Sequence, residues 1–331
     1  MQYRLSFLAI ALSLSSTTIA QVPQPAPDET SPHGTVLFNR NEDSPAAEKK
    51  AQSPAIQKLA TLSDAERSSL TFTAYDLDVH LIPAKSQLAV RAAFTVRNSG
   101  TQPLSRLAFQ ISSSLHWESV ALRNAERLQP VPFGEHLIDT DADHTGQAKE
   151  AIVSLPQPLA PGSTVEFTAL YSGEIMESGK RLERIGAPAT QATQADWDKI
   201  ATEATALRGF GNVLWYPTAT APALLGDGAK LFQSVGQTKL QQSAATIRLR
   251  LTVEYVGDPP KAAYFCGHRE QLLSVSENIN ALVADAPGVA TAEFSARPLG
   301  FRTPSLFVTD MAMTATSDNL VSALKEKDKK F

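Results

Sequence analysis

Apolar and polar residues alternate along much of the chain with a period of two. Such a pattern places every second side chain on the same face of a strand, so that one face is buried and the other meets solvent. The apolar positions are Tyr75, Leu77, Val79 and Leu81; Leu88, Val90, Ala92, Phe94 and Val96; Leu107, Phe109 and Ile111; Val165, Phe167, Ala169 and Tyr171; and Ile247, Leu249, Leu251, Val253 and Tyr255. The pattern predicts half-buried strands in each of these segments.

Turn-forming residues separate the predicted strands. The phrases "PAKS" at 83–86, "NSGTQPL" at 98–104 and "LAPGS" at 159–163 combine Pro, Gly, Asn and Ser, which favour turns. Short strands that alternate with such turns are typical of a mainly β protein, and we expect an antiparallel β-sandwich.

One segment changes to a helical period. Between residues 193 and 208, apolar residues recur three or four positions apart, and a glycine that can end a helix follows at once. These residues are Trp197, Ile200, Ala204, Leu207 and Gly209. The sequence therefore predicts a short helical insertion at 193–208.

The first residues have the features of a targeting segment. Arg4 precedes an apolar run, and small residues follow up to Ala20, as in a secretory signal peptide that is cleaved after Ala20. We expect an exported protein, periplasmic or extracellular. Residues 21–66 are rich in Pro, Ala and Ser and predict a disordered linker. Near its end, Ser63 and Glu66 have the spacing of a helix capping box.

Composition limits the remaining possibilities. The 331 residues are 43% hydrophobic and carry a formal net charge of −4, and no basic stripe with interleaved aromatic residues points to nucleic acid. No apolar run after residue 20 is long enough for a transmembrane helix. We expect one β-sandwich domain at 67–312 and a charged helical tail at 313–331.

The common catalytic motifs are missing from the sequence. It contains no Gly-x-Ser-x-Gly, no phosphate-binding loop and no His-Glu-x-x-His. The phrase "GDGAKL" at 226–231 has two glycines of a dinucleotide-binding fingerprint but lacks the third. The single cysteine, Cys266, is two residues from His268; it reads either as a buried small side chain or as a thiol near a base.

One acidic loop has partial calcium-ligand spacing. Asp139, Asp141, Asp143 and Glu150 stand where a calcium-binding loop places carboxylates. However, His144 takes the position that needs glycine for a sharp turn, and the flanking residues resemble strands rather than helices. The loop is therefore a calcium candidate with a solvated acidic hairpin as the alternative.

The stretch "GFGNVLWYPTATAPALLGDGAKLF" at 209–232 concentrates aromatic residues, proline and glycine. Such a density suggests either a shaped turn or a surface that meets a partner. In the second case Trp215 and Tyr216 are the candidate interaction residues, since aromatic side chains supply most of the contact energy of many interfaces.

Several phrases, in order, resemble the opening of zinc aminopeptidases of the membrane alanyl aminopeptidase family. They are residues 74–120, "LPQPLAPGSTVEFTALYSGEI" at 155–175, "WYPTATAP" at 215–222, "AATIRLRLTVEY" at 244–255 and "ARPLGFRTPSLFVTD" at 296–310. The resemblance covers about residues 70–310 as one domain. It implies a saddle-like, antiparallel β-sandwich, in which Trp215, Tyr216, Pro217 and Pro222 turn the chain between strands.

The chain departs from the family pattern at the residues that serve chemistry. Ala221 stands where the family has an acid before the proline, and no acid or amide occurs near 206–208, where a residue that helps to hold the substrate amine is expected. The zinc-binding His-Glu-x-x-His and the Gly-x-Met-x-Asn strand do not occur. The resemblance therefore implies no catalytic residue, and zinc only in a full-length relative.

Three functions follow as hypotheses. The first is a non-catalytic N-terminal domain, or a truncated fragment, that packs against a catalytic domain absent from this chain. The second is a stand-alone secreted module that binds a peptide or protein through 209–232. The third is an independent enzyme that uses Cys266 or a calcium-assisted site.

Overall fold

The alternating segments form the strands of the protein. The computed structural model describes residues 62–124, 127–219, 227–276 and 287–309, all within one compact unit. In β1 (Leu70–Ile82) and β2 (Gln87–Asn98), buried apolar side chains alternate with more exposed ones. The prediction of a mainly β protein is confirmed.

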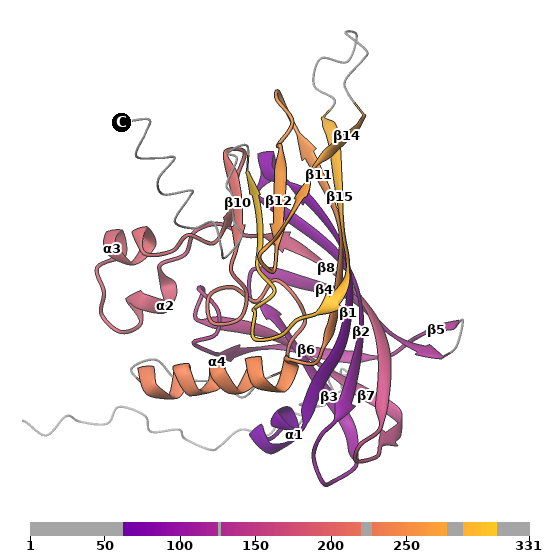
Figure 1. The fold of residues 1–331 in the computed structure, drawn as a ribbon. Helices are drawn as coiled ribbons and strands as arrows, with labels where there is room; N and C mark the ends of the chain where they lie inside the picture. Colours follow the sequence, from indigo (N-terminus) through magenta and orange to yellow (C-terminus); the bar gives the residue numbers. More distant parts are fainter. Residues whose placement is uncertain (1–61, 125–126, 220–226, 277–286, 310–331) are drawn as a thin grey trace, which may run out of the picture. The chain divides into compact units, whose positions relative to one another are not determined.

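The strands of the described residues form three sheets (Figure 1). The largest follows the order β14-β15-β11-β1-β2-β8-β4-β5. Its other members are β4 (Leu115–Asn124), β5 (Arg127–Pro130), β8 (Thr164–Glu174), β11 (Thr246–Tyr255), β14 (Leu273–Ser276) and β15 (Gly288–Pro298). Neighbouring strands in it are antiparallel except β1 and β11, which run parallel.

The two smaller sheets are antiparallel. The five-stranded sheet consists, in order, of β13 (His268–Gln271), β12 (Ala262–Phe265), β16 (Leu306–Thr309), β10 (Ala204–Leu207) and β9 (Lys199–Ile200). The three-stranded sheet consists of β3 (Leu104–Ser112), β7 (Gln147–Leu159) and β6 (Phe133–Asp139).

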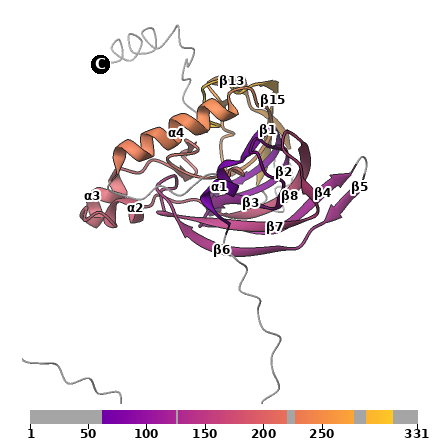
Figure 2. The same ribbon diagram turned by 90° about the horizontal axis from the view of Figure 1, so that it is seen from below.

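Aromatic side chains join the sheets into layers. Phe109 of β3 lies 5.0 Å from Phe94 of β2 and 4.9 Å from Phe167 of β8, measured between ring centres. Figure 2 shows β3, β7 and β6 along the larger sheet. Phe265 of β12 lies 5.6 Å from Phe294 of β15, so the five-stranded sheet packs on the large sheet too. A fully buried aromatic side chain contributes about 1.5–3 kcal/mol, and these contacts form one continuous core.

The other face of the large sheet carries charged side chains. Arg250 of β11 pairs with Asp78 of β1, and Arg248 pairs with Glu293 of β15. Exposed pairs of this kind contribute only about 0–1 kcal/mol each. This face of the large sheet therefore meets solvent, whereas its other face is buried. The difference explains why polar and apolar residues alternate along its strands.

Four helices lie in the described residues: α1 (Asp64–Ser68), α2 (Lys180–Glu183), α3 (Ala189–Gln194) and α4 (Gly228–Gln242), with a 3-10 turn at Pro83–Lys85. The predicted capping box of α1 is confirmed. The Glu66 amide donates to the Ser63 hydroxyl at 3.3 Å, and the Ser63 amide donates to the Glu66 carboxylate at 2.7 Å.

The predicted helix at 193–208 does not form. Helix α3 ends at Gln194, and the chain then runs into β9 and β10. Strand β10 pairs with β16 on one side and β9 on the other, so pairing with distant residues overrides the local helical period. Trp197, which contributed to that period, is 68% exposed and is not a core residue.

Three predicted segments lie wholly or mostly outside the described residues: the signal peptide 1–20, the linker 21–66 as far as residue 61, and the tail 313–331. Among the residues that are described, no helix combines the length and apolar character needed to cross a membrane.

Candidate functional site

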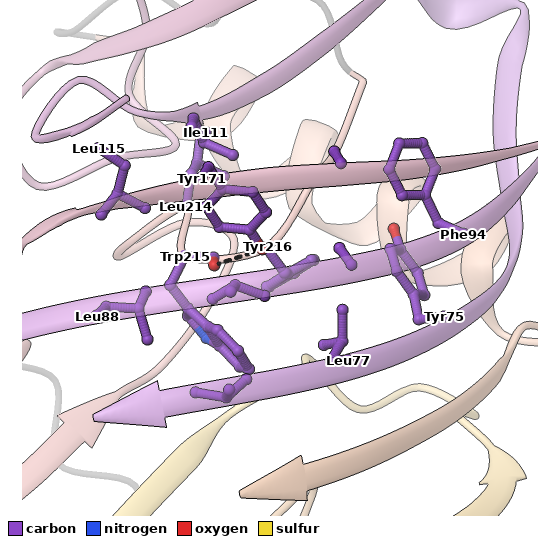
Figure 3. Packing of buried hydrophobic residues seen from close by; sticks show 14 of the residues in the cluster. Tyr75, Leu77, Leu88, Phe94, Ile111, Leu115, Tyr171, Leu214, Trp215 and Tyr216 are labelled. Carbon is purple, nitrogen blue, oxygen red and sulfur yellow. Dashed lines mark hydrogen bonds between the residues drawn. The ribbon is translucent and has the colours of Figure 1, made fainter. Parts of the chain in front are cut away.

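The segment around Trp215 is built into the core. Trp215 is 0% exposed and Tyr216 is 1% exposed. The Trp215 indole N–H donates to the Pro304 carbonyl at 3.0 Å, and the Tyr171 hydroxyl donates to the Trp215 carbonyl at 3.2 Å (Figure 3). The Tyr75 hydroxyl donates to the Pro217 carbonyl at 3.0 Å. Every polar group named here is therefore satisfied inside the protein.

This burial corrects the hypothesis that Trp215 and Tyr216 form an interaction surface. A side chain that meets a partner must be accessible before binding, and both rings are enclosed by the β-sandwich. The physical reason is the apolar area of the two rings, which stabilises the fold when it is removed from water.

The same segment continues the edge of the three-stranded sheet. The Gln110 and Thr218 backbones exchange hydrogen bonds of 2.7 and 3.1 Å, and the Ser112 amide donates to the Leu214 carbonyl at 2.7 Å. At the start of the segment, Gly209 has φ +84° and lies against the Pro304 carbonyl. Glycine is needed there because a left-handed backbone and a close approach coincide.

The acidic loop is connected to neighbouring segments by hydrogen bonds to the buried carboxylate of Asp143. Asp143 is 0% exposed and accepts hydrogen bonds from the Ser112 hydroxyl, the Thr145 amide and hydroxyl, and the Leu214 amide at 2.7–3.1 Å. Its carboxylate thus ties the loop to β3 and to the Trp215 segment. Asp141 is also buried, and burial raises the pKa of its carboxyl.

The fourth calcium candidate lies apart from the loop. Glu150 sits within β7 opposite His136, whereas Asp139 is at the end of β6 opposite Gln147. Glu150 is 0% exposed and binds Arg67 of α1 through two hydrogen bonds of 2.7 and 2.8 Å, as well as the Gln110 amide at 2.9 Å.

The calcium candidates therefore do not converge on one point. Asp139 pairs instead with Arg184 at 3.5 Å. Within the described ranges, no group of three or more His, Cys, Asp or Glu side chains is arranged to hold a metal ion. The spacing along the sequence resembled a ligand set, but the antiparallel pairing of β6 and β7 carries Glu150 away from the loop.

A second buried network surrounds His144. Its Nδ1 lies 2.6 Å from a carboxylate oxygen of Asp196. Arg208 contacts Asp196 at 3.3 Å and Asp198 at 2.7 Å. This network was not predicted from the sequence, because His144 and Asp196 are 52 residues apart.

The His144–Asp196 pair has the geometry of a base and its orienting carboxylate, but it is enclosed. Both side chains are less than 10% exposed, and neither lines a cavity described below. A general base must reach the proton of a substrate. The contacts of this pair join the acidic loop to the chain around Asp196.

Cys266 is buried in the turn between β12 and β13, not beside His268 on a strand. Burial raises the pKa of its thiol to about 12. A nucleophilic cysteine acts as the thiolate, so this environment favours a structural role.

Two hollows occur on the surface of the described residues. A cavity of about 70 Å³ lies where the large and five-stranded sheets meet, and its lining includes Pro83, Glu203 and Tyr255. A groove of about 390 Å³ lies on the charged face of the large sheet, and its lining includes His80 and Arg91. In the groove, Nε2 of His80 is 2.9 Å from a carboxylate oxygen of Glu254.

Comparison with known proteins gives matches among solved structures alone. No family model matches, and no curated protein matches. The chain is similar to a two-domain M1 zinc metallopeptidase mutant bound to L-arginine, with 18% identity and a TM-score of 0.42, over 73% of this chain and 43% of that chain.

A second similar structure is the M1 zinc metallopeptidase from Deinococcus radiodurans, with 18% identity and a TM-score of 0.41. The match covers 72% of this chain and 42% of that one. This chain thus spans less than half the length of the solved structures that it matches.

Proposed function

We propose that this chain is a non-catalytic N-terminal domain, or a fragment, of an exported zinc aminopeptidase-like protein. It would pack against a catalytic domain that this sequence does not contain. The ordered phrases between residues 70 and 310 support the family assignment, and the predicted signal peptide at 1–20 supports export to the periplasm or the extracellular space.

The observation that carries this proposal is the burial of Trp215 and Tyr216. The resemblance assigns these residues to a chain turn between sandwich strands, and a stand-alone binding module would instead need them exposed. Their hydrogen bonds to the core favour the domain over the module.

Zinc does not fit the described residues of this chain. A zinc site needs three or four His, Cys, Asp or Glu side chains around one point, and the described part of the chain offers no such group. Zinc and the activation of water would therefore belong to the catalytic domain, and to none of the described residues of this chain.

Large exposed apolar side chains in and around α2, α3 and α4 support a packing partner. Trp197 is 68% exposed and Phe232 of α4 is 80% exposed, and Met176 and Ile185 are each more than half exposed. Exposed apolar side chains of this size are typical of surfaces that meet another domain. By contrast, the outer face of the large sheet carries ion pairs.

Purified residues 21–331 should not cleave aminoacyl anilides, with or without added zinc. Zinc-dependent cleavage that a chelator abolishes would overturn the proposal. The same sample should self-associate with increasing concentration in analytical ultracentrifugation, because its apolar side chains lack their partner.

A matched set of variants locates that surface. The double variant Trp197→Ser, Phe232→Ser should be monomeric at concentrations where the parent associates. Leu273→Ser, at a 60% exposed side chain on the edge strand β14, should associate like the parent. Equal association of all three proteins would argue against a packing surface around α2, α3 and α4.

A further inference from the structure

The segment between β8 and β10 forms an insertion whose two ends lie side by side. The Ile200 amide donates to the Ile175 carbonyl at 2.9 Å, which brings the two ends of the insertion together. Between these ends lie α2 and α3, and Figures 1 and 2 show the two helices side by side. We refer to residues 176–198 as the insertion.

The insertion is fastened to the acidic loop through buried polar atoms. Asp196, near its end, contacts Nδ1 of His144 at 2.6 Å and also accepts from the Ser178 amide at 2.8 Å and the Asp198 amide at 3.1 Å. Asp198 in turn accepts from the Arg208 amide at 2.6 Å. One carboxylate therefore organises both ends of the insertion and joins them to the loop.

The charges around His144 come from three segments. Asp143 precedes it on the acidic loop, Asp196 and Asp198 belong to the insertion, and Arg208 lies beyond β10. Arg181 of α2 approaches from the other side: its amide donates to the His144 carbonyl at 3.2 Å, and its guanidinium donates to the Asp141 carbonyl at 3.0 Å.

The charged side chains that act on His144 are thus mainly carboxylates. Asp143, Asp196 and Asp198 act on its imidazole, and the cation Arg208 pairs with the latter two. A protonated imidazole adds a positive charge in the place where these carboxylates converge, and a neutral imidazole does not. The effective dielectric constant inside a protein is lower than that of water, so the attraction between this charge and the carboxylates is stronger there than in water.

We propose that His144 and Asp196 form a proton-dependent clasp that holds the insertion against the sandwich. The clasp is tight while the imidazole is charged and loosens when it becomes neutral. The insertion carries the exposed Trp197 and Met176, so the clasp also sets how firmly this apolar surface is held. The clasp is independent of the proposed function.

The pKa directions agree with this arrangement. Burial opposes the charge of His144, but the hydrogen bond that its ring donates to Asp196 and the charges of the three aspartates outweigh it, and the pKa of His144 is raised. Burial also disfavours the charge of Asp196, but His144 and the backbone amides outweigh it, and the pKa of Asp196 is lowered.

The sign of the pH dependence follows from these directions. A raised histidine pKa contributes stability that is complete below the ordinary value of 6.5 and is lost as the pH rises through the folded value. A lowered aspartate pKa contributes stability above the ordinary value of 3.8 that is lost as the pH falls through the folded value. The clasp is therefore tightest between these two limits.

Amide hydrogen exchange of the full 331-residue chain tests the clasp directly. The amides of Ser178, Asp198 and Arg208 report on it, because each donates to one of its carboxylates. After correction for intrinsic exchange, their opening constant should rise by about threefold or more from pH 6 to pH 9, since protonation stabilises the closed form. Amides in the centre of β2 should not respond.

Two variants separate the clasp from general stability. His144→Gln keeps a donor for Asp196 without a charge, and its reporter amides should open equally at both pH values. His136→Gln removes a part-exposed histidine of β6 that contacts Glu150 of β7. The pH response of the reporter amides should persist in this variant.

A response that survives in His144→Gln would overturn the proposal, as would a parent protein without any response. Should His144→Gln fail to fold, the titration of the His144 ring by NMR in the parent decides the question. A pKa at or below that of an ordinary histidine would then contradict the clasp.

Discussion

Trp215 and Trp197 show how differently two tryptophans of one chain are used. Trp215 is enclosed, and its N–H reaches a backbone carbonyl. Trp197 is exposed, and Arg208 lies 5.8 Å from its ring centre. The first side chain stabilises the sandwich, and the second is available to a neighbour.

Trp215→Ala should lower the free energy of unfolding by about 3–5 kcal/mol, because it leaves a large cavity and removes a buried hydrogen bond. Urea denaturation measures this change. Trp197→Ala is the control and should stay within about 0.5 kcal/mol of the parent, as surface substitutions do. Equal effects of the two substitutions would show that Trp215 is not part of the core.

Glu150→Gln should destabilise the protein by about 3 kcal/mol or more, because it leaves the buried Arg67 without its full counter-charge. The same denaturation experiment applies. Glu166→Gln is a matched control at a 43% exposed carboxylate paired with Arg123, and about 0–1 kcal/mol is expected there. A small effect at Glu150 would mean that α1 is not anchored by this pair.

Cys266 should resist alkylation by iodoacetamide at pH 8, because burial raises its pKa to about 12 and shields the sulfur. Intact-mass measurement over time gives the rate of labelling, and labelling in denaturant gives the reference for an accessible thiol. Rapid labelling of the native protein would support the hypothesis of a reactive thiol instead.

At the level of elements, strands β1, β2, β3, β8 and β11 were predictable from the sequence, and β9 and β10 were not. The alternation from Tyr75 to Leu81 has one physical cause, a sheet with one buried face, and a period of two expresses it directly. The helical spacing from Trp197 to Leu207 had no such cause, since β10 is set by pairing with β16. Helix α4 begins after Asp227, whose side chain accepts from the Lys230 amide at 2.9 Å. The sequence patterns did not predict a helix over Gly228–Gln242.

The turn that starts the Trp215 segment depends on Gly209. Gly209→Ala should cost more stability than Gly257→Ala, although both residues have φ near +85°. Each substitution incurs about 1–2 kcal/mol of backbone strain. Only at Gly209 would the added carbon also lie 2.6 Å from the Pro304 carbonyl, whereas the surroundings of Gly257 are open.

Thermal unfolding of the two glycine variants, side by side, measures the difference. The melting temperature of Gly209→Ala should be lower than that of Gly257→Ala by several degrees, since each kcal/mol shifts the melting temperature of a protein of this size by about 2–4 °C. Equal melting temperatures would show that the close approach at Gly209 carries no cost.

At the scale of the whole molecule, the sequence phrases were informative about architecture but not about the polar centres. The acidic loop illustrates the limit: Asp143 and Glu150 have ligand spacing along the chain, yet strand pairing sends them to separate networks. The partner of Asp196 is His144, 52 residues away. Such contacts form only in the tertiary structure, and the spacing of residues along the sequence does not predict them.

We propose that this chain forms the front domain of a larger zinc aminopeptidase-like protein. The most direct measurement is the intact mass of the native protein from its source cells, captured with an antibody against residues 67–175. Our account predicts a mass several hundred residues larger than that of residues 21–331. A mass that matches residues 21–331 would contradict it and would favour a stand-alone binding module.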